Sequence, residues 1–205
     1  NSAGMATSAV AQVSIVPVHI PGQAVLVDFG PNDGVNGNIT TSPDANGNYW
    51  NNMVSGPTVA NGLSITNLVT ANNTANPLAV TVTSTTWLDN GIQNGGLTNP
   101  TNALLGDFAI ATATEDYFHL QGAGVMGTLR ISGLNPLRSY NFSMFGTRNT
   151  SDIRNSIYSV TDVNGTHTVT LQTSGAWVNS GLNPTDPPGN DKTIVSSDLR
   201  SGTGL

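Results

Sequence analysis

The 205-residue chain has no cysteine and very little charge. The absence of cysteine excludes a disulfide framework, thiolate metal sites and a cysteine nucleophile. Only 9% of the residues are charged, the net charge is −6, and Lys192 is the single lysine. Nucleic-acid binding needs a basic face that neutralises phosphates, so nucleic acid is not an expected partner. Adsorption to an anionic membrane surface is disfavoured for the same reason.

Long apolar runs are also absent. No run approaches the roughly 20 residues that a membrane-spanning helix needs, so no membrane insertion is expected. The chain begins at Asn1 without an initiator methionine or a basic leader, which is typical of a mature secreted chain. We therefore expect a secreted protein, extracellular or on the cell surface. Five Asn-x-Ser/Thr sequons are candidate glycosylation sites, unless they arise by chance in an Asn-rich chain: Asn38, Asn72, Asn141, Asn149 and Asn164.

The apolar pattern indicates strands. No segment keeps a 3.6-residue period, and short β-branched runs recur between turn signals such as Asn164-Gly165. Apolar and polar residues alternate in Tyr140–Phe145, as in a strand with one buried face. The pattern predicts an all-β fold, an antiparallel two-sheet β-sandwich. Strands are expected near residues 24–29, 58–69, 78–87, 115–120, 127–132, 139–147, 157–163 and 167–173, with a short helix near 102–109.

The N-terminal run at residues 13–20 is apolar, β-branched and uncharged. It predicts an additional strand, with Pro17 at a bulge or edge position because proline has no amide hydrogen. An exposed apolar strand is prone to aggregate, so this one needs a partner. We expect an N-terminal arm over residues 1–22 and a single β-sandwich domain over residues 23–205. The residues available for strand donation are Val13, Ile15, Val16, Val18 and Ile20.

Several motifs follow one another in a characteristic order: VLVDFG (25–30), NYWNN (48–52), LGDFA (105–109), ISGLNP (131–136), and residues 140–148 followed by Arg154 and YSVT (158–161). Their order resembles the galactose-binding-like β-jelly-roll modules of secreted and surface bacterial proteins, some of which accompany polysaccharide-degrading enzymes. The resemblance covers about residues 25–173 and implies a jelly roll without a defined activity. Such modules continue into closing apolar strands after a segment like residues 190–195. Half of residues 182–205 are Pro, Gly, Asp or Ser, which predicts a jelly roll that lacks its closing strand.

Signatures of catalysis are incomplete. Residues 30–33 (GPND) resemble one block of the SGNH esterases, but the site that would match their nucleophile carries Phe108 in place of a serine. No G-x-S-x-G elbow occurs, and the three histidines lack the pairwise spacing of a metal site. Glu115 and Asp116 are adjacent, so on a strand they would point to opposite faces and could not act on one glycosidic bond. We therefore expect no enzyme and no catalytic residues.

Two groups of residues are candidates for binding a polysaccharide. Arg148 and Arg154 flank Asp152, and guanidinium groups suit planar anions such as uronate or sulfate. The alternative is that these three residues brace a loop. Trp177 lies in a Ser- and Gly-rich stretch and is the best candidate for an exposed ring that stacks on a sugar.

A structural calcium ion is the one cofactor that the sequence suggests. Asp44, Asn46 and Asn48 space three oxygen-bearing side chains like the first half of a calcium loop. Tyr49 and Ser55 stand where such a loop has its glycine and its glutamate. The alternative interpretation is that the three residues only shape a turn.

Two functions from different classes fit the sequence. The first is a non-catalytic extracellular structural subunit that assembles head-to-tail with copies of itself into a surface filament or matrix. In that hypothesis the N-terminal strand of one subunit fills the missing strand position of the next. The alternative is a carbohydrate-binding module for an extracellular polysaccharide, whose own N-terminal strand closes its sheet.

Overall fold

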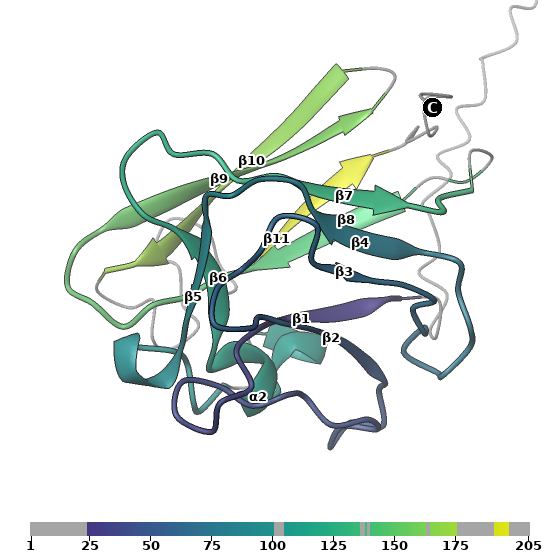
Figure 1. Cartoon of the computed structure of the whole chain (residues 1–205), viewed down its shortest axis with the longest axis horizontal. Coiled ribbons are helices and arrows are strands. Elements are labelled where there is room, and N and C mark those ends of the chain that lie inside the picture. Colours follow the sequence, from purple (N-terminus) through teal and green to yellow (C-terminus); the bar gives the residue numbers. More distant parts are fainter. Residues whose placement is uncertain are drawn as a thin grey trace, which may run out of the picture.

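The structure, a computed structural model, describes residues 24–100, 105–135, 138, 140–162, 165–175 and 191–196. These residues are mostly strand with little helix, which confirms the all-β fold class (Figure 1). No helix in the described ranges has the length and apolar character needed to cross a membrane. The helical segments are η1 (Ile92–Asn94), η2 (Gly106–Phe108) and α2 (Ala111–Thr114). The strands are β1 (Leu26–Gly30), β2 (Trp50–Val54), β3 (Ser64–Ile65), β4 (Ala79–Val82), β5 (Trp87–Asn90), β6 (Tyr117–Leu120), β7 (Leu129–Ser132), β8 (Tyr140–Phe145), β9 (Arg154–Asp162), β10 (Gly165–Ser174) and β11 (Asp191–Ser196).

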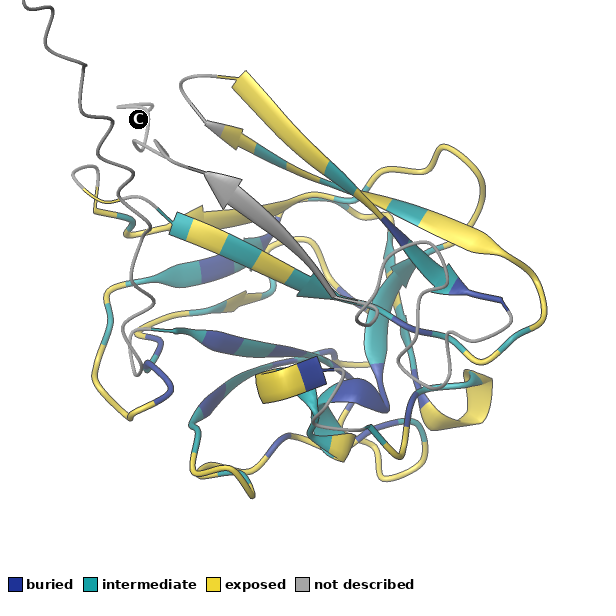
Figure 2. Ribbon diagram, turned by 180° about the vertical axis from the view of Figure 1, so that it is seen from behind, coloured by how far each residue is buried: buried dark blue, intermediate teal, exposed yellow. Residues whose placement is uncertain are grey.

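The strands form small open sheets. β3, β4 and β7 make one antiparallel sheet, and β5–β6, β8–β11 and β9–β10 are antiparallel pairs. The β9–β10 ladder pairs Asp162 with Gly165, so the two strands form a hairpin, but its connection lies one residue before the predicted Asn164-Gly165 turn. Much of this hairpin is exposed (Figure 2). These ladders alone do not establish a two-sheet sandwich or a jelly roll.

One pair departs from the predicted antiparallel arrangement. β1 and β2 run parallel, in register from Leu26 opposite Trp50 to Gly30 opposite Val54. Parallel strands need a long connection, and residues 31–49 are long enough to carry the chain back to the start of β1. β2 was also missing from the predicted strands. The apolar pattern shows which face of a strand is buried but not its direction, so it could not predict this pair.

β1 lies between two apolar clusters. Its residues Val27 and Phe29 pack against the larger cluster, which is built on Met53, Val80 and Val82 among others. Leu26, on the opposite face of β1, belongs to a second cluster with Trp50 and Ala71. Successive side chains of a strand point to opposite faces, so β1 contributes to both clusters. Trp50 and Trp87 therefore belong to the core. Trp50 is part of the second cluster, and Trp87 is a partly buried ring that packs against the larger cluster.

The predicted strands are recovered in part. β8 and β10 show the expected alternation, with Leu171 fully buried and Thr168 and Thr170 exposed. The run predicted at 58–69 shortens to β3, and the run at 78–87 divides into β4 and the start of β5. Of the predicted helix at 102–109, the described part forms η2.

The C-terminal part of the chain supplies a strand that the sequence analysis did not include. β11 pairs antiparallel with β8, from Asp191 opposite Phe145 to Ser196 opposite Tyr140. Its centre is the β-branched run Thr193, Ile194 and Val195, whose strand preference is masked in the sequence by the surrounding Pro, Gly and Ser. The N-terminal arm, with the five residues predicted for strand donation, lies outside the described residues.

Candidate functional site

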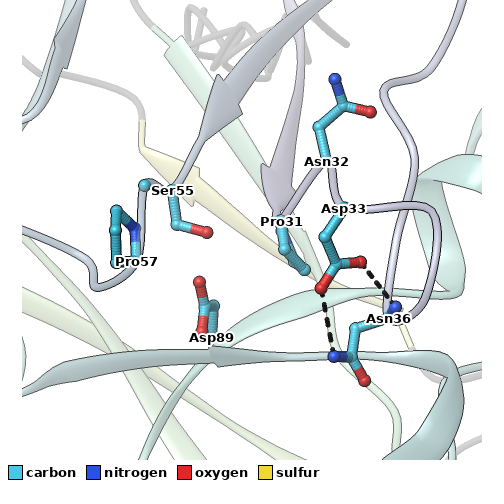
Figure 3. A pocket seen from close by; sticks show the side chains of 8 residues that line it. Pro31, Asn32, Asp33, Asn36, Ser55, Pro57 and Asp89 are labelled. Atoms are coloured by element: carbon cyan, nitrogen blue, oxygen red, sulfur yellow. Dashed lines mark hydrogen bonds between the residues drawn. The ribbon is translucent and has the colours of Figure 1, made fainter.

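A cavity of about 380 Å³ opens beside the end of β1 and the residues that follow β2. Because β1 and β2 are parallel, their carboxyl ends meet at one edge, and β5 contributes a third wall (Figure 3). The cavity is about half open to solvent, and its lining is mostly polar. The lining residues are Pro31, Asn32, Asp33, Asn36, Ser55, Gly56, Pro57 and Asp89.

Oxygen atoms without partners are the main chemical feature of this lining. Ser55 Oγ and Asn36 Oδ1 are buried and have no hydrogen-bond partner. The Asp89 side chain, from β5, also makes no hydrogen bond to the described residues, and Figure 3 shows it directed into the cavity together with Ser55. The lining contains no basic and no aromatic side chain. The cavity therefore offers donors and acceptors to a neutral polar ligand.

Asp33 shapes the loop that forms one wall. Its Oδ1 accepts hydrogen bonds from the backbone N–H groups of Asn36 at 2.7 Å and Val35 at 2.8 Å, and its Oδ2 accepts from Asn36 Nδ2 at 3.3 Å (Figure 3). These bonds, that of the Asn36 N–H first, lower the pKa of Asp33 to about 2. Asp33 is therefore ionised and stabilises the turn, and its oxygens are largely occupied by hydrogen bonds from the loop.

Two buried carboxyl groups lie near the cavity but do not line it. Asp28 and Asp116 are 5% and 6% exposed. Asp28 Oδ2 accepts hydrogen bonds from Thr40 Oγ1 at 2.9 Å and from the Thr40 backbone N–H at 3.2 Å. Asp28 Oδ1 and Asp116 Oδ1 have no hydrogen-bond partner. Burial first, and then the charge of Asp28, raise the pKa of Asp116 to about 9, and burial raises that of Asp28 to about 6.

Glycines let the chain close around Asp116. A Cβ on Gly30 would lie 2.5 Å from Asp116 Oδ1 and closer still to the rest of the carboxyl group. A Cβ on Gly37 would lie 2.6 Å from Asp116 Cβ, and it too would overlap the carboxyl group. No larger residue fits at either position while Asp116 stays in place.

The sequence interpretation of Glu115 and Asp116 was wrong. They were expected on one strand, facing opposite sides, but β6 begins only at Tyr117 and Glu115 has helical backbone angles at the end of α2. Both side chains are buried, and the charge of Glu115 adds to the rise in the pKa of Asp116. Glu115 Oε1 accepts a hydrogen bond from Asn38 Nδ2 at 2.9 Å.

The predicted arginine site is divided in the structure. Arg154 Nη2 lies 3.3 Å from Asp152 Oδ2 in an exposed ion pair. Arg148 Nε instead donates to the Asn94 carbonyl oxygen at 3.1 Å, which also accepts a hydrogen bond from Tyr117 Oη. These contacts support the alternative that the arginines brace loops, whereas anion binding stays a prediction. Trp177 lies outside the described residues.

The predicted calcium turn is held by hydrogen bonds. Asp44 Oδ1 accepts from the backbone N–H groups of Asn46 at 2.8 Å and Asn48 at 2.9 Å. Asp44 Oδ2 accepts from Trp50 Nε1 at 2.7 Å. Both carboxylate oxygens therefore already have N–H donors, which supports the turn-shaping interpretation. Among the described residues, no group of three His, Cys, Asp or Glu side chains is arranged to hold a metal ion.

Four of the five predicted glycosylation sites are in described segments. Asn38, Asn72, Asn141 and Asn149 are all exposed, as attachment of a glycan requires. Asn164 lies outside the described residues. Occupancy of these sites stays a prediction.

The β7 edge carries exposed apolar side chains. β7 pairs with β4 on one side and has no strand on its other side among the described ladders. Leu129 and Ile131 of β7 are 38% and 37% exposed, and Met126, in the preceding loop, is 80% exposed. An open edge of this kind can pair with another chain.

Comparisons of the chain with protein-family models, curated proteins and solved structures give no match. The resemblance to galactose-binding-like modules therefore stays a prediction from the motif order.

Proposed function

We propose that the protein is a non-catalytic, secreted β-rich module that binds an uncharged sugar unit of an extracellular polysaccharide in the cavity beside β1 and β2. The observation that carries this proposal is that side-chain oxygens of Ser55, Asn36 and Asp89 have no hydrogen-bond partner among the described residues. Sugar hydroxyl groups both donate and accept hydrogen bonds, and buried polar groups without partners favour a ligand that satisfies them. A galactose-binding-like jelly roll is the architecture expected with this function.

The charge of the lining favours neutral sugars. Asp33 and Asp89 are acidic, and no basic side chain lines the cavity. A uronate or sulfate group would meet like charge there, which disfavours it. The only described ligand-binding candidates with positive charge, Arg148 and Arg154, bond to Asn94 and Asp152 instead.

The acids near the cavity are arranged poorly for glycoside cleavage. Cleavage needs one carboxyl group that stays protonated beside the substrate. Asp33 and Asp89 line the cavity, and the pKa of Asp33 is lowered to about 2. Asp116 and Asp28 have raised pKa values but do not line the cavity. This separation supports binding without catalysis.

Affinity gel electrophoresis tests the proposal. The wild-type protein should be retarded in gels that contain a neutral polysaccharide, and Asp89→Ala and Ser55→Ala should abolish the retardation. Arg148→Ala is the matched control and should bind like the wild type, because Arg148 does not line the cavity. If Arg148→Ala lost binding while Asp89→Ala bound fully, the site would lie near Arg148 and the proposal would be overturned.

Strand donation is a second candidate function, favoured by the β7 edge. Its exposed apolar residues Leu129 and Ile131 offer an acceptor for an apolar strand such as residues 13–20 of another copy. We rank it second because β11 already supplies one strand in the C-terminal part of the chain.

Light scattering of the intact protein tests strand donation. The hypothesis expects concentration-dependent polymers that disappear on deletion of residues 1–22 and in the edge variant Ile131→Lys. A Thr170→Lys variant, on the exposed face of β10, controls for added charge. A monomer at all concentrations would overturn this second candidate and leave the sugar-binding proposal untouched.

A further inference from the structure

We propose that the protein has a second, independent site, in which a hard divalent cation, Ca²⁺ by preference, binds between the carboxylates of Asp28 and Asp116. This site is distinct from the sugar cavity and from the turn at Asp44.

The first argument is that the carboxyl groups of Asp28 and Asp116 lie close together. Asp28 and Gly30 are two residues apart on β1, so they point to the same face of the strand. Gly30 has no side chain, and the Asp116 carboxyl group fills the space where one would lie. The carboxyl groups of Asp28 and Asp116 are therefore neighbours on one face of β1, although 88 positions separate them in the sequence.

The second argument is that the two buried carboxyl groups are incompletely hydrogen-bonded and lie among negative charges. Both side chains are more than nine-tenths buried, and each has a carboxyl oxygen, Oδ1, without a hydrogen-bond partner. The charged groups that act on Asp116 are Asp28, Glu115 and Asp33, all of them negative. An ionised carboxylate in such surroundings is unfavourable unless a cation or a proton neutralises it.

The third argument is the chemistry of the available ligands. Hard cations prefer oxygen ligands, and Ca²⁺ accepts irregular sets that include carboxylates, amide oxygens and water. The main-chain carbonyl oxygen of Asn36 is a neutral oxygen near Asp116, because a Cβ on Gly91 would overlap it and would also lie 2.9 Å from Asp116 Cβ.

Calcium and terbium titrations test the proposal. At pH 8 in a chelator-washed sample, Ca²⁺ should raise the unfolding temperature, and Tb³⁺ should give luminescence sensitised by neighbouring Tyr117. Calorimetry should show binding of about one Ca²⁺ per chain.

Variants locate the ion. Asp116→Asn and Asp28→Asn keep the side-chain shapes and should each weaken Ca²⁺ binding at least tenfold, whereas Asp44→Asn should bind like the wild type. Circular dichroism confirms that each variant is folded. The proposal is overturned if wild-type protein shows neither a Ca²⁺-dependent shift nor Tb³⁺ luminescence. It is equally overturned if Asp44→Asn abolishes binding that Asp116→Asn retains.

Discussion

The Asp116 carboxyl group lies directly over Gly30, in the space that a side chain at position 30 would occupy. This contact joins β1 to the segment that precedes β6, and it places a buried acid beside Asp28 on the same face of β1. In the sequence VDFG, Asp28 thus provides one acid, and Gly30 leaves the space in which the second acid, Asp116, packs.

The first prediction concerns the space that Gly30 leaves for the Asp116 carboxyl group. Gly30→Ala should destabilise the protein by about 1–3 kcal/mol, because the new Cβ overlaps a carboxyl group that is itself closely packed. Gly30 does not have a positive φ, so the loss should come from overlap and not from backbone strain. Urea denaturation measures the change.

Gly56→Ala is the matched control. A Cβ there meets nothing within 4 Å and Gly56 is exposed, so its stability should stay within about 0.5 kcal/mol of the wild type. Equal effects of the two substitutions would show that Gly30 is not specially packed.

The second prediction concerns the pH dependence of stability in the absence of divalent cations. The pKa of Asp116 is raised from 3.8 to about 9 on folding, and that of Asp28 to about 6. A folded-state pKa above the unfolded value gives stability that is present below pH 4 and is lost as pH rises through the folded pKa. The free energy of unfolding in EDTA should therefore fall between pH 6 and pH 9 through Asp116, which faces the acids Asp28, Glu115 and Asp33.

Asp116→Asn should flatten this decline, because its amide does not titrate. The Asp33 carboxyl group does not interfere, since its lowered pKa of about 2 affects stability only under strongly acidic conditions. Denaturation curves at half-unit steps of pH check the prediction. Parallel curves for wild type and variant from pH 6 to pH 9 would contradict it.

The third prediction concerns the turn before β2. Asp44→Ala removes the acceptor of two backbone N–H groups and of the buried Trp50 indole. The loss should be about 2–3 kcal/mol, because a buried donor is left without its charged partner. Thermal unfolding in the presence of EDTA measures this loss separately from any effect of calcium.

Asp152→Ala provides the comparison for Asp44→Ala. Asp152 is 70% exposed at its side chain and pairs only with exposed Arg154, so removal should change stability by less than about 0.5 kcal/mol. A larger loss for Asp152→Ala than for Asp44→Ala would reverse our interpretation of the two turns.

The strands that the sequence predicted well are those whose side chains alternate. In β10, for example, Leu171 is buried and Thr170 is exposed, and this period of two is visible in the sequence. β2 was not predicted because Asn51 and Asn52 lie at its centre, and asparagine has low strand preference. The Asn51 side chain bonds to the backbone of both Leu26 and Val69, so it links two segments much as a strand would.

The candidate site was not predictable in the same way. Its cavity is formed by three segments, which contain Asn36, Ser55 and Asp89, and no local pattern connects them. The Asp28–Asp116 pair likewise depends on a close approach between segments far apart in sequence. Local patterns did indicate a turn at Asp44 as the alternative to a calcium ligand, because an Asp side chain bonds to backbone N–H groups a few residues ahead.

The measurement that tests the sugar-binding proposal most directly is a nuclear magnetic resonance titration of the full chain with a soluble neutral oligosaccharide. Backbone amide shifts report where the ligand lies even when it binds weakly. We predict that the largest changes occur at the cavity, in residues 32–37 and at Ser55, Gly56 and Asp89. Changes confined to Arg148, Arg154 and their neighbours, or no changes with any of a broad panel of neutral oligosaccharides, would contradict the proposed site.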